Sequence, residues 1–507
     1  MRRTEITAAL SVAADAGMGH PADLTLASAA VAARLARALG LGDADVRACH
    51  EVALLRFAGC TSDSDVASKV FGDEVSARRA IATADFGHAS SVIGTAFRKL
   101  HAEDPLVVRL PKVLRAVAGM GALFGSAIAH CEVAQGLARS LGYDDRVVAA
   151  LALAFERWDG RGIPRRLRED EIPLEVHVSS LAHDFTLFHR LFGRDAALEM
   201  AEERSGGAHD PALVAALARH QRDLFDVLDA PSPWTAALDA EPEPHARLEG
   251  DAPESAVAAL GDFADLKGAT RAGHSRSVAT LVDRTARRTG MSDEERRDLR
   301  WAAYAHDLGV AATTASVWDK PSPLTDAERE SIRIHPYLTE RCLARGETLE
   351  RIGRIAALHH ERLDGSGYPK TARADALGRS ARLLAVADAV VGMGSDRPHR
   401  RALPPERVVK EIESAVTDGT LCGSAARDVL DAMGASANVA LPGGLTSREI
   451  EVLRHLALGK TMKETAVALG IATKTADNHA QRIYAKIGVT TRGAAALWAM
   501  RTGIVRA

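Results

Sequence analysis

Cysteine is scarce in this chain, and the cysteines that are present do not form pairs. Its 507 residues contain five cysteines, and none stands in a Cys-x-x-Cys pattern. An odd, scattered set excludes a disulfide framework and favours a reducing compartment, so we expect a cytoplasmic protein. No apolar run reaches the ~18 residues of a membrane span, and no basic-then-apolar stretch begins the chain. We therefore expect no membrane partner and no secretion.

Aromatic residues and net charge are also low. Aromatics make up 4% of the chain, whereas hydrophobic residues make up 47% and charged residues 26%. This composition indicates a globular protein, and its alanine-rich apolar runs favour packed helices over sheets. The formal net charge of −3 excludes a chain that binds polyanions over its whole surface. The length suggests about three domains.

Helical periodicity is present throughout, and two breaks divide it. Apolar residues recur at i, i+3 and i+4 in segments 24–42, 274–292, 406–419 and 447–460. Residues 229–254 are rich in proline, alanine and acid, which is typical of a linker. A second break at 434–444 precedes the C-terminal residues. The predicted pieces are 1–228, the linker 229–254, 255–434 and 443–507.

The chain contains an internal repeat. The sequence HHERLDGSGYP (359–369) matches AFERWDGRGIP (154–164) at six of eleven positions, with a shift of 205 residues. The same shift places His130 on His335 and His183 on Asp388. Markers in the same order along a gapless block predict a duplication rather than chance similarity between alanine-rich helices.

Further upstream the shift changes, and the first copy lacks the His-Asp pair of the second copy. A shift of 250 places Arg56 and Phe57 on His306 and Asp307, and a shift of 254 places His20 on His274. Arginine and phenylalanine cannot replace a metal-binding His-Asp pair. We therefore predict a structural or sensory role for the first piece.

The second copy concentrates residues that bind metals. They are His274, His306, Asp307, His335, His359, His360 and Asp388. Any one of these histidines, taken alone, is more often a hydrogen-bonded core or surface residue. Together, histidine and carboxylate suit borderline metals such as iron, manganese or zinc. Seven ligands exceed the needs of one tetrahedral ion, so two ions bridged by Asp307 fit the number better.

Four motifs now carry a resemblance. AHDLG, a downstream histidine, HHERLDGSGYP and AVADAVVGMGSDRPHRRA resemble the HD-GYP family of HD phosphohydrolases, over about residues 260–434. The resemblance implies an all-helical phosphodiesterase that acts on cyclic di-GMP or a related cyclic nucleotide. It implies two divalent metal ions, iron or manganese before zinc, on the seven residues above, with His306 and Asp307 as the catalytic pair. The loop residues that would border the substrate are Asp364, Gly365, Gly367 and Tyr368.

The second copy departs from the family pattern at three places. The family's lysine after HD-x-G is Val310 here, and that lysine faces the substrate phosphate. Some members carry a glutamate where Thr270 stands, and it completes a third metal site. Leu377 and Gly378 replace an Ile-Pro pair. We therefore expect two metal ions rather than three, and weakened or redirected handling of phosphate.

The C-terminal piece is basic. Residues 440–507 contain ten Lys and Arg against four Asp and Glu, which is typical of a small DNA-binding module. The sequence from 445 to 489 resembles the LuxR-type helix-turn-helix, with Thr446 and Glu449 as a capping box. It implies a scaffold helix at 460–470, a recognition helix at 473–488 and double-stranded DNA as partner. The predicted DNA-binding residues are Lys474, Thr475, Asn478, His479, Arg482, Lys486 and Arg492.

A last apolar helix at 492–503 suits self-association, so we expect a homodimer. The predicted fold is all-α: two HD-type helical bundles in tandem, the first degenerate, followed by a small four-helix LuxR-type helix-turn-helix domain. The predicted function is a DNA-binding transcriptional regulator whose HD-GYP-type domain degrades or senses a cyclic nucleotide or dinucleotide. Two alternatives are a phosphodiesterase that the helix-turn-helix only localises, and a non-catalytic ligand- or metal-sensing transcription factor.

Overall fold

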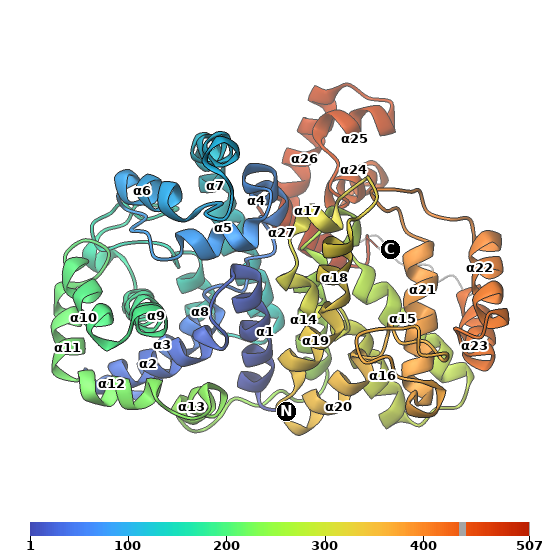
Figure 1. The fold of residues 1–507 in the computed structure, drawn as a ribbon, viewed down its shortest axis with the longest axis horizontal. Helices are drawn as coiled ribbons and strands as arrows, with labels where there is room; N and C mark the ends of the chain where they lie inside the picture. Colours follow the sequence, from blue (N-terminus) through green and yellow to red (C-terminus); the bar gives the residue numbers. More distant parts are fainter. Residues whose placement is uncertain (435–442, 506–507) are drawn as a thin grey trace. The chain divides into compact units, whose positions relative to one another are not determined.

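The computed structural model describes residues 1–434 and 443–505, and every regular element in that part is a helix (Figure 1). The chain divides into two compact units, Met1–Ala252 and Pro253–Ala507. The prediction of an all-α fold is confirmed. No helix in the described part is long and apolar enough to cross a membrane.

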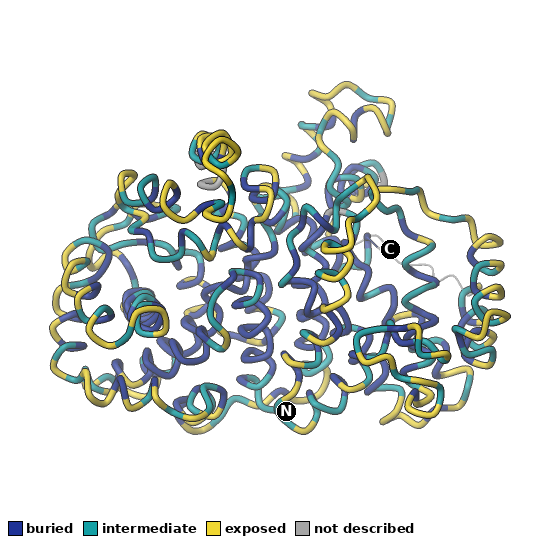
Figure 2. The backbone as a smooth tube through the Cα atoms, in the orientation of Figure 1, coloured by how far each residue is buried: buried dark blue, intermediate teal, exposed yellow. Residues whose placement is uncertain are grey.

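The first unit contains thirteen α-helices among its described residues. They are α1 (Arg3–Met18), α2 (Leu24–Ala38), α3 (Asp43–Leu55), α4 (Ser64–Phe71), α5 (Glu74–Ile81), α6 (Ala89–Lys99), α7 (Leu106–Ser140), α8 (Asp145–Leu151), α9 (Leu174–Phe192), α10 (Arg194–Glu203), α11 (Pro211–Arg219), α12 (Gln221–Leu228) and α13 (Pro233–Ala240). Helix α2 is buried almost throughout, and it packs against α3, α9 and α13. Its alanines let neighbouring helices approach closely, so the core forms around α2 (Figure 2).

Helices α4 to α7 form a separate small core in the first unit. Its buried residues include Phe71, Ile81, Leu100 and Val113. The shift between the two copies falls from 250 to 205 across this segment, so the first copy has 45 more residues here than the second. The start of α7 exposes apolar side chains, with Val107 86% exposed and Leu110 50% exposed.

Residues 229–248 do not form the predicted linker. Trp234 and Ala237 of α13 are buried, and Glu241 accepts hydrogen bonds from Arg2 (2.7 Å) and Thr4 (2.8 Å). The proline-rich composition suggested an extended connection. The structure corrects this, because one face of α13 is apolar and a buried carboxylate ties the segment to the start of the chain.

The second unit begins with the helices that carry the histidines. They are α14 (Ala252–Asp265), α15 (His274–Arg288), α16 (Asp293–Ala305), α17 (Ala315–Trp318), α18 (Asp326–Arg333), α19 (His335–Leu343), α20 (Glu347–Ala356), α21 (Arg379–Met393), α22 (Pro405–Thr417) and α23 (Gly423–Met433). Short 3-10 turns lie at Ala269–Arg271 and Leu308–Ala312. Helices α15, α16 and α21 pack together, which places the ends of several helices around one point.

Four further helices form the C-terminal module: α24 (Ser447–Ala457), α25 (Met462–Leu469), α26 (Thr473–Ile487) and α27 (Arg492–Arg501). The predicted capping box is confirmed, since Thr446 N donates to Glu449 (2.8 Å) and Glu449 N donates to Thr446 Oγ1 (3.3 Å). Helix α27 differs from the expectation. Its Leu497 and Met500 are buried and the helix packs on α24, so these apolar residues stabilise the module itself rather than a partner.

The two copies share local geometry as well as sequence. Helices α2 and α15 each have 15 residues, and their second residues, Thr25 and Ser275, donate a backbone hydrogen bond of 2.9 Å to Asp15 and Asp265 respectively. The offset is therefore 250 here, not 254. This corrects the alignment of His20 with His274: Leu24 occupies the equivalent position, because the buried cap fixes the register of the helix.

Candidate metal centre

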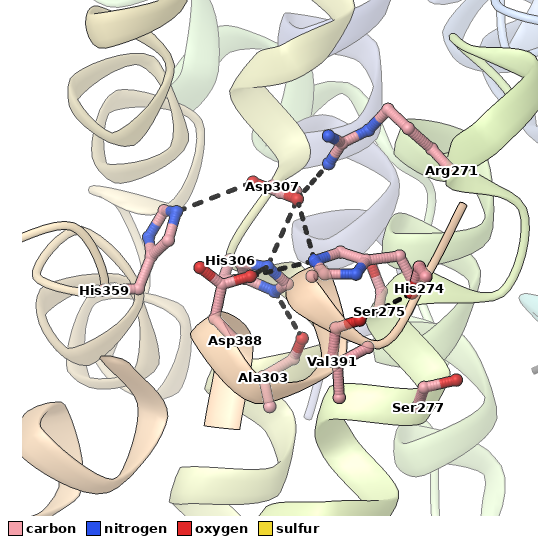
Figure 3. A network of polar contacts seen from close by, with 12 residues as sticks. Arg271, His274, Ser275, Ser277, Ala303, His306, Asp307, His359, Asp388 and Val391 are labelled. Atoms are coloured by element: carbon pink, nitrogen blue, oxygen red, sulfur yellow. Dashed lines mark hydrogen bonds and ion pairs between the residues drawn. The ribbon is translucent and has the colours of Figure 1, made fainter. Parts of the chain in front are cut away.

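The seven predicted ligands converge from the ends of four helices and from one helix interior. His274 begins α15, His306 and Asp307 follow α16, and His335 begins α19. His359 and His360 lie in the turn after α20, and Asp388 lies within α21. Helix ends carry free backbone groups and sharp turns, so side chains from distant segments meet there (Figure 3).

Asp307 lies at the middle of this cluster, with one oxygen directed to each side. Its Oδ1 lies 3.1 Å from His335 Nε2 and 3.6 Å from His359 Nε2. Its Oδ2 lies 3.2 Å from His306 Nε2 and 3.7 Å from His274 Nε2. A carboxylate placed in this way has the geometry of a bridge between two cation sites (Figure 3).

Asp388 and His360 extend the cluster on either side of Asp307. Asp388 Oδ1 lies 3.0 Å from His274 Nε2, and its Oδ2 lies 3.8 Å from His360 Nδ1. His274, His306 and Asp388 have ligand atoms close enough to share one ion, as have His335, His359 and His360. The structure thus brings all seven predicted residues together.

Backbone carbonyls fix three of the imidazole rings. The Nδ1 atoms of His306, His335 and His359 lie 2.7, 2.6 and 2.7 Å from the carbonyl oxygens of Ala303, Ile332 and Ala356. Each Nδ1 therefore carries a proton and donates a hydrogen bond to a carbonyl three residues earlier, which leaves Nε2 of a neutral ring as a lone-pair acceptor. Yet the Nε2 atoms of His335 and His359 are 3.1 Å apart. Two acceptors at this distance repel each other unless a cation lies between or beside them.

Burial and charge act in opposite directions in the cluster. Burial lowers the pKa of His274 to about 4 and lowers that of His359. Burial also opposes the charge on His306, but Asp307 and Asp388 outweigh it and raise its pKa to about 10. Burial disfavours ionised Asp307 as well, but Arg271 and His306 hold its pKa well below the usual range. Asp307 and Asp388 are therefore both ionised, and a metal ion that binds His306 Nε2 has to displace a proton from it.

Sequence reasoning missed one residue of the cluster, Arg271. It is 4% exposed, pairs with Asp307 Oδ2, and stacks over Trp318 with its guanidinium carbon 4.6 Å from the ring. Its Nε finds no hydrogen-bond partner among the residues that the structure describes. In the sequence, Arg271 stands out only because it lies three residues before the candidate ligand His274, and this spacing alone does not place it at the site.

The predicted substrate loop contributes mainly its shape. Asp364 is exposed and accepts hydrogen bonds from the backbone and hydroxyl of Ser366, so it stabilises its own turn. A side chain on Gly367 would lie 2.5 Å from the backbone of Glu361, so only glycine fits there. Tyr368 is the loop residue that reaches the histidines, with its ring 4.8 Å from that of His360. Gly365 has a φ of 83°, which also favours glycine.

The equivalent place in the first unit is filled by aromatic rings. Phe57 packs 4.7 Å from His183 and 4.8 Å from His20, and Phe155 packs 4.9 Å from His130. Arg56 is buried and donates to the backbone of Ala154. Among the described residues, the groups that could share a metal ion all lie between His274 and Asp388. The first copy retains the fold around a packed interior.

The predicted DNA-binding residues divide into two groups. Lys474, Thr475, Asn478 and Arg482 are exposed along one side of α26. Three others are engaged within the module: Lys486 pairs with Glu449 (2.7 Å), Arg492 donates to the Leu456 carbonyl (2.8 Å), and His479 is half-buried. The structure therefore leaves the N-terminal part of the predicted recognition helix accessible.

Comparison with known families places both modules of the second unit. Residues 259–421 match the HD domain family, and residues 444–499 match the bacterial regulatory proteins of the luxR family. The chain thus carries an HD domain followed by a LuxR-type DNA-binding domain, as the motifs predicted.

The relatives are cyclic-dinucleotide phosphodiesterases. The chain is 27% identical over 416 residues to the 3′3′-cGAMP-specific phosphodiesterase 3 of Vibrio cholerae serotype O1, covering 81% of this chain and 90% of that protein. It is 36% identical over 143 residues to a cyclic di-GMP phosphodiesterase of Thermotoga maritima, covering 28% of this chain and 39% of the relative. A crystal structure of a cyclic GMP-AMP-specific phosphodiesterase of Vibrio cholerae superimposes with a TM-score of 0.59 at 23% identity, covering 86% of this chain and 99% of the other. That last likeness concerns the fold.

Proposed function

We propose that the HD domain binds two divalent transition-metal ions and hydrolyses a phosphodiester bond of a cyclic dinucleotide. The observation that carries this proposal is the facing pair of Nε2 acceptors on His335 and His359, 3.1 Å apart beside the Asp307 carboxylate. Five imidazoles and two carboxylates suit iron or manganese, and also zinc. The names of the relatives indicate the substrate class.

Each side chain has a definite task in this proposal. His274, His306 and Asp388 would hold one ion, His335, His359 and His360 would hold the other, and Asp307 would contribute a carboxylate oxygen to each. When bound, the ions supply Lewis acidity at phosphorus and a water of lowered pKa. Arg271 lies beside Asp307, where its guanidinium is placed to donate to a phosphate oxygen. The Tyr368 ring would form one wall of the substrate site, next to His360.

A second candidate function is a non-catalytic sensor. Val310 is fully buried at the place of the family's phosphate-binding lysine, and Arg271 pairs with the bridging carboxylate. Both features suit a site that binds a nucleotide without cleaving it. The two functions differ in one measurable property, which is metal-dependent turnover.

Hydrolysis and metal content together test the proposal. We expect the purified full-length protein to hold about two metal ions and to linearise cyclic di-GMP or 3′3′-cGAMP. Asp307→Ala should lose metal and lower turnover by at least about 10²-fold. Asp326→Ala, which removes an exposed carboxylate on α18, is the matched control. Bound metal and nucleotide without any turnover would establish the sensor instead.

We further infer that α26 binds double-stranded DNA and that the protein is a homodimer. The exposed basic and amide side chains at the start of α26 are placed to enter the major groove. The apolar face at the start of α7 offers a surface for a second copy, since α27 is used within the chain. A transcriptional regulator that binds paired half-sites requires such a dimer.

A further inference from the structure

A cavity of about 590 Å³ lies between the HD domain and the helix-turn-helix module of the second unit. The HD side of its lining consists of Thr270, Ala272 and the loop 394–402. The other side consists of Leu458, Gly459, Lys460 and Glu464, from the end of α24 and the start of α25. Both sides belong to one compact unit. The volume lies within the range of small-molecule sites.

The HD side of the cavity is lined by residues that lie next in sequence to the candidate metal centre, although none of the seven candidate ligands lines it. Thr270 and Ala272 flank Arg271, and the loop 394–402 follows α21, which carries Asp388. Arg397 belongs to this loop and lies in the electrostatic field of Asp388 and Asp307. Arg397 thus connects the two places: a ligand that reaches from the metal centre past this side chain would enter the cavity.

The lining is mainly basic. Arg397, Arg400, Arg401 and Lys460 line it, against Asp396 and Glu464. Arg400 donates hydrogen bonds to carbonyl groups at the end of α21 and in its own loop, and Arg401 pairs with Asp396 (3.0 Å). Arg397 makes no such side-chain bond among the described residues, and although burial and Arg271 lower its pKa to about 10, it stays charged at neutral pH. The backbone of Ala402 and the side chain of Arg401 lower the pKa of Asp396, and the charge of Lys460 adds to this effect. Lys460 Nζ also lies 2.9 Å from His455 Nδ1, so a bound phosphate would share the ammonium with this ring.

We propose that this cavity receives the second phosphate of a bound cyclic dinucleotide, and that Lys460 supplies part of its binding from the DNA-binding module. The inference rests on the proposed function. A cyclic dinucleotide carries two phosphodiester anions, and only one of them can lie on the metal ions at a time. The other needs cations outside the centre, and the cavity provides Arg397 from one domain and Lys460 from the other.

A second contact links the same two modules. The carbonyl oxygen of Val505, at the end of the helix-turn-helix module, would lie 2.7 Å from a Cβ built on Gly273. Gly273 immediately precedes His274 and has a φ of 80°. Because Val505 is 2% exposed, the end of the module is packed in place. Ligand binding and DNA binding would thus act on shared contacts, and each should change the affinity for the other by the same factor.

Lys460→Glu tests the inference in the full-length, manganese-loaded protein. Lys463→Glu is the matched control, because it makes the same charge change on an exposed residue of α25 outside the cavity. We expect Lys460→Glu to weaken binding of phosphorothioate analogues of cyclic di-GMP and 3′3′-cGAMP at least about tenfold. Lys463→Glu should leave nucleotide affinity unchanged.

The reciprocal measurement uses a fluorescent DNA duplex at low salt. We expect the analogue to change DNA affinity at least about fivefold in the wild type and in Lys463→Glu, and not in Lys460→Glu. Two results would overturn the inference and leave the proposed function standing. One is a Lys460→Glu protein that binds the nucleotide analogue as tightly as the wild type does. The other is a wild-type protein whose DNA affinity does not change when the analogue is bound. Failure of the wild type to bind either analogue would overturn both.

Discussion

Arg271 shows how one side chain can change the chemistry of a site. The chain lacks the family's lysine at 310, where Val310 is fully buried. The structure places a different cation, Arg271, against the Asp307 carboxylate, stacked on Trp318. A planar guanidinium can donate to two phosphate oxygens at once, which an ammonium cannot do in the same geometry. Arg271 is thus the candidate for the cation that binds the substrate phosphate in place of the missing lysine.

At Arg271 we expect Arg271→Ala to reduce kcat/KM for cyclic di-GMP or 3′3′-cGAMP on the order of 10²-fold, because a charged hydrogen bond to phosphate is lost. Steady-state kinetics, with metal content measured in parallel, checks this. Introducing Val310→Lys into the same variant should restore part of the loss. An Arg271→Ala protein with more bound metal and undiminished turnover would show instead that the arginine competes with the ions.

At the scale of elements, α13 illustrates how burial sets pH dependence. His50 of α3 is fully buried, and its Nε2 lies 2.8 Å from the carbonyl oxygen of Ala237 in α13. Burial lowers its pKa to about 4. The folded state therefore holds a neutral ring, whereas the unfolded chain takes up a proton near pH 6.5.

The sign of this effect follows from linkage. The contribution of His50 to the free energy of unfolding is fully present above about pH 6.5 and is lost as the pH falls towards 4, with a size on the order of 3 kcal/mol. We expect the protection factors of the α13 amides, which are the ratios of intrinsic to observed exchange rates, to fall as the pH is lowered over this range. His50→Gln should flatten the dependence. An equal dependence in both proteins would assign the effect to other groups.

Helix α26 gives the second prediction at this scale. We expect Arg482→Ala to weaken binding of a DNA duplex and to reduce its salt dependence, because an exposed cation facing phosphate is removed. Lys486→Ala should instead lower the stability of the module, since Lys486 pairs with Glu449 of the capping box. Anisotropy titrations at several salt concentrations and thermal unfolding separate the two effects. Equal loss of DNA affinity without loss of stability in Lys486→Ala would contradict this division.

At the scale of the whole molecule, the two copies of the internal repeat share local geometry but differ in the side chains at the site. The cis bond before Pro164 has its counterpart before Pro369. Glu156 and Glu361 each accept backbone hydrogen bonds from the loop that follows. Yet Phe57 fills in the first unit the place that Asp307 holds in the second. Duplication therefore preserved the scaffold while only one copy kept the donor set.

The oligomeric state is the prediction that belongs to this scale. Val107, Leu110 and Leu114 are exposed on α7 with the 3-4 spacing of a helix–helix seam, and Leu114 is 52% exposed. We expect the protein to sediment as a dimer, and Leu110→Glu with Leu114→Glu to shift it towards monomer. Arg109→Glu with Lys112→Glu, charge changes on the same helix, serves as the control. A dimer that survives both pairs of substitutions would place the interface elsewhere.

The sequence by itself determined the architecture and supplied the seven candidate ligands. Helical periodicity, the HHERLDGSGYP and AHDLG motifs and the basic C-terminal piece were sufficient for an all-α chain with an HD domain and a LuxR-type domain. They were sufficient because these features are local: a helix period, a cap or a metal ligand depends on residue type and spacing. The seven predicted ligands needed no distant partner to be recognised.

Only the tertiary structure decided which groups meet. It moved the first-copy equivalent of His274 from His20 to Leu24, turned the predicted linker into part of a core, and engaged Lys486 inside its own module. It also brought Arg271 to Asp307, and Lys460 to the rim of a cavity beside loop 394–402. The reason is physical: burial, ion pairing and register depend on side chains that lie far apart in sequence, and their proximity is a property of the packed helices.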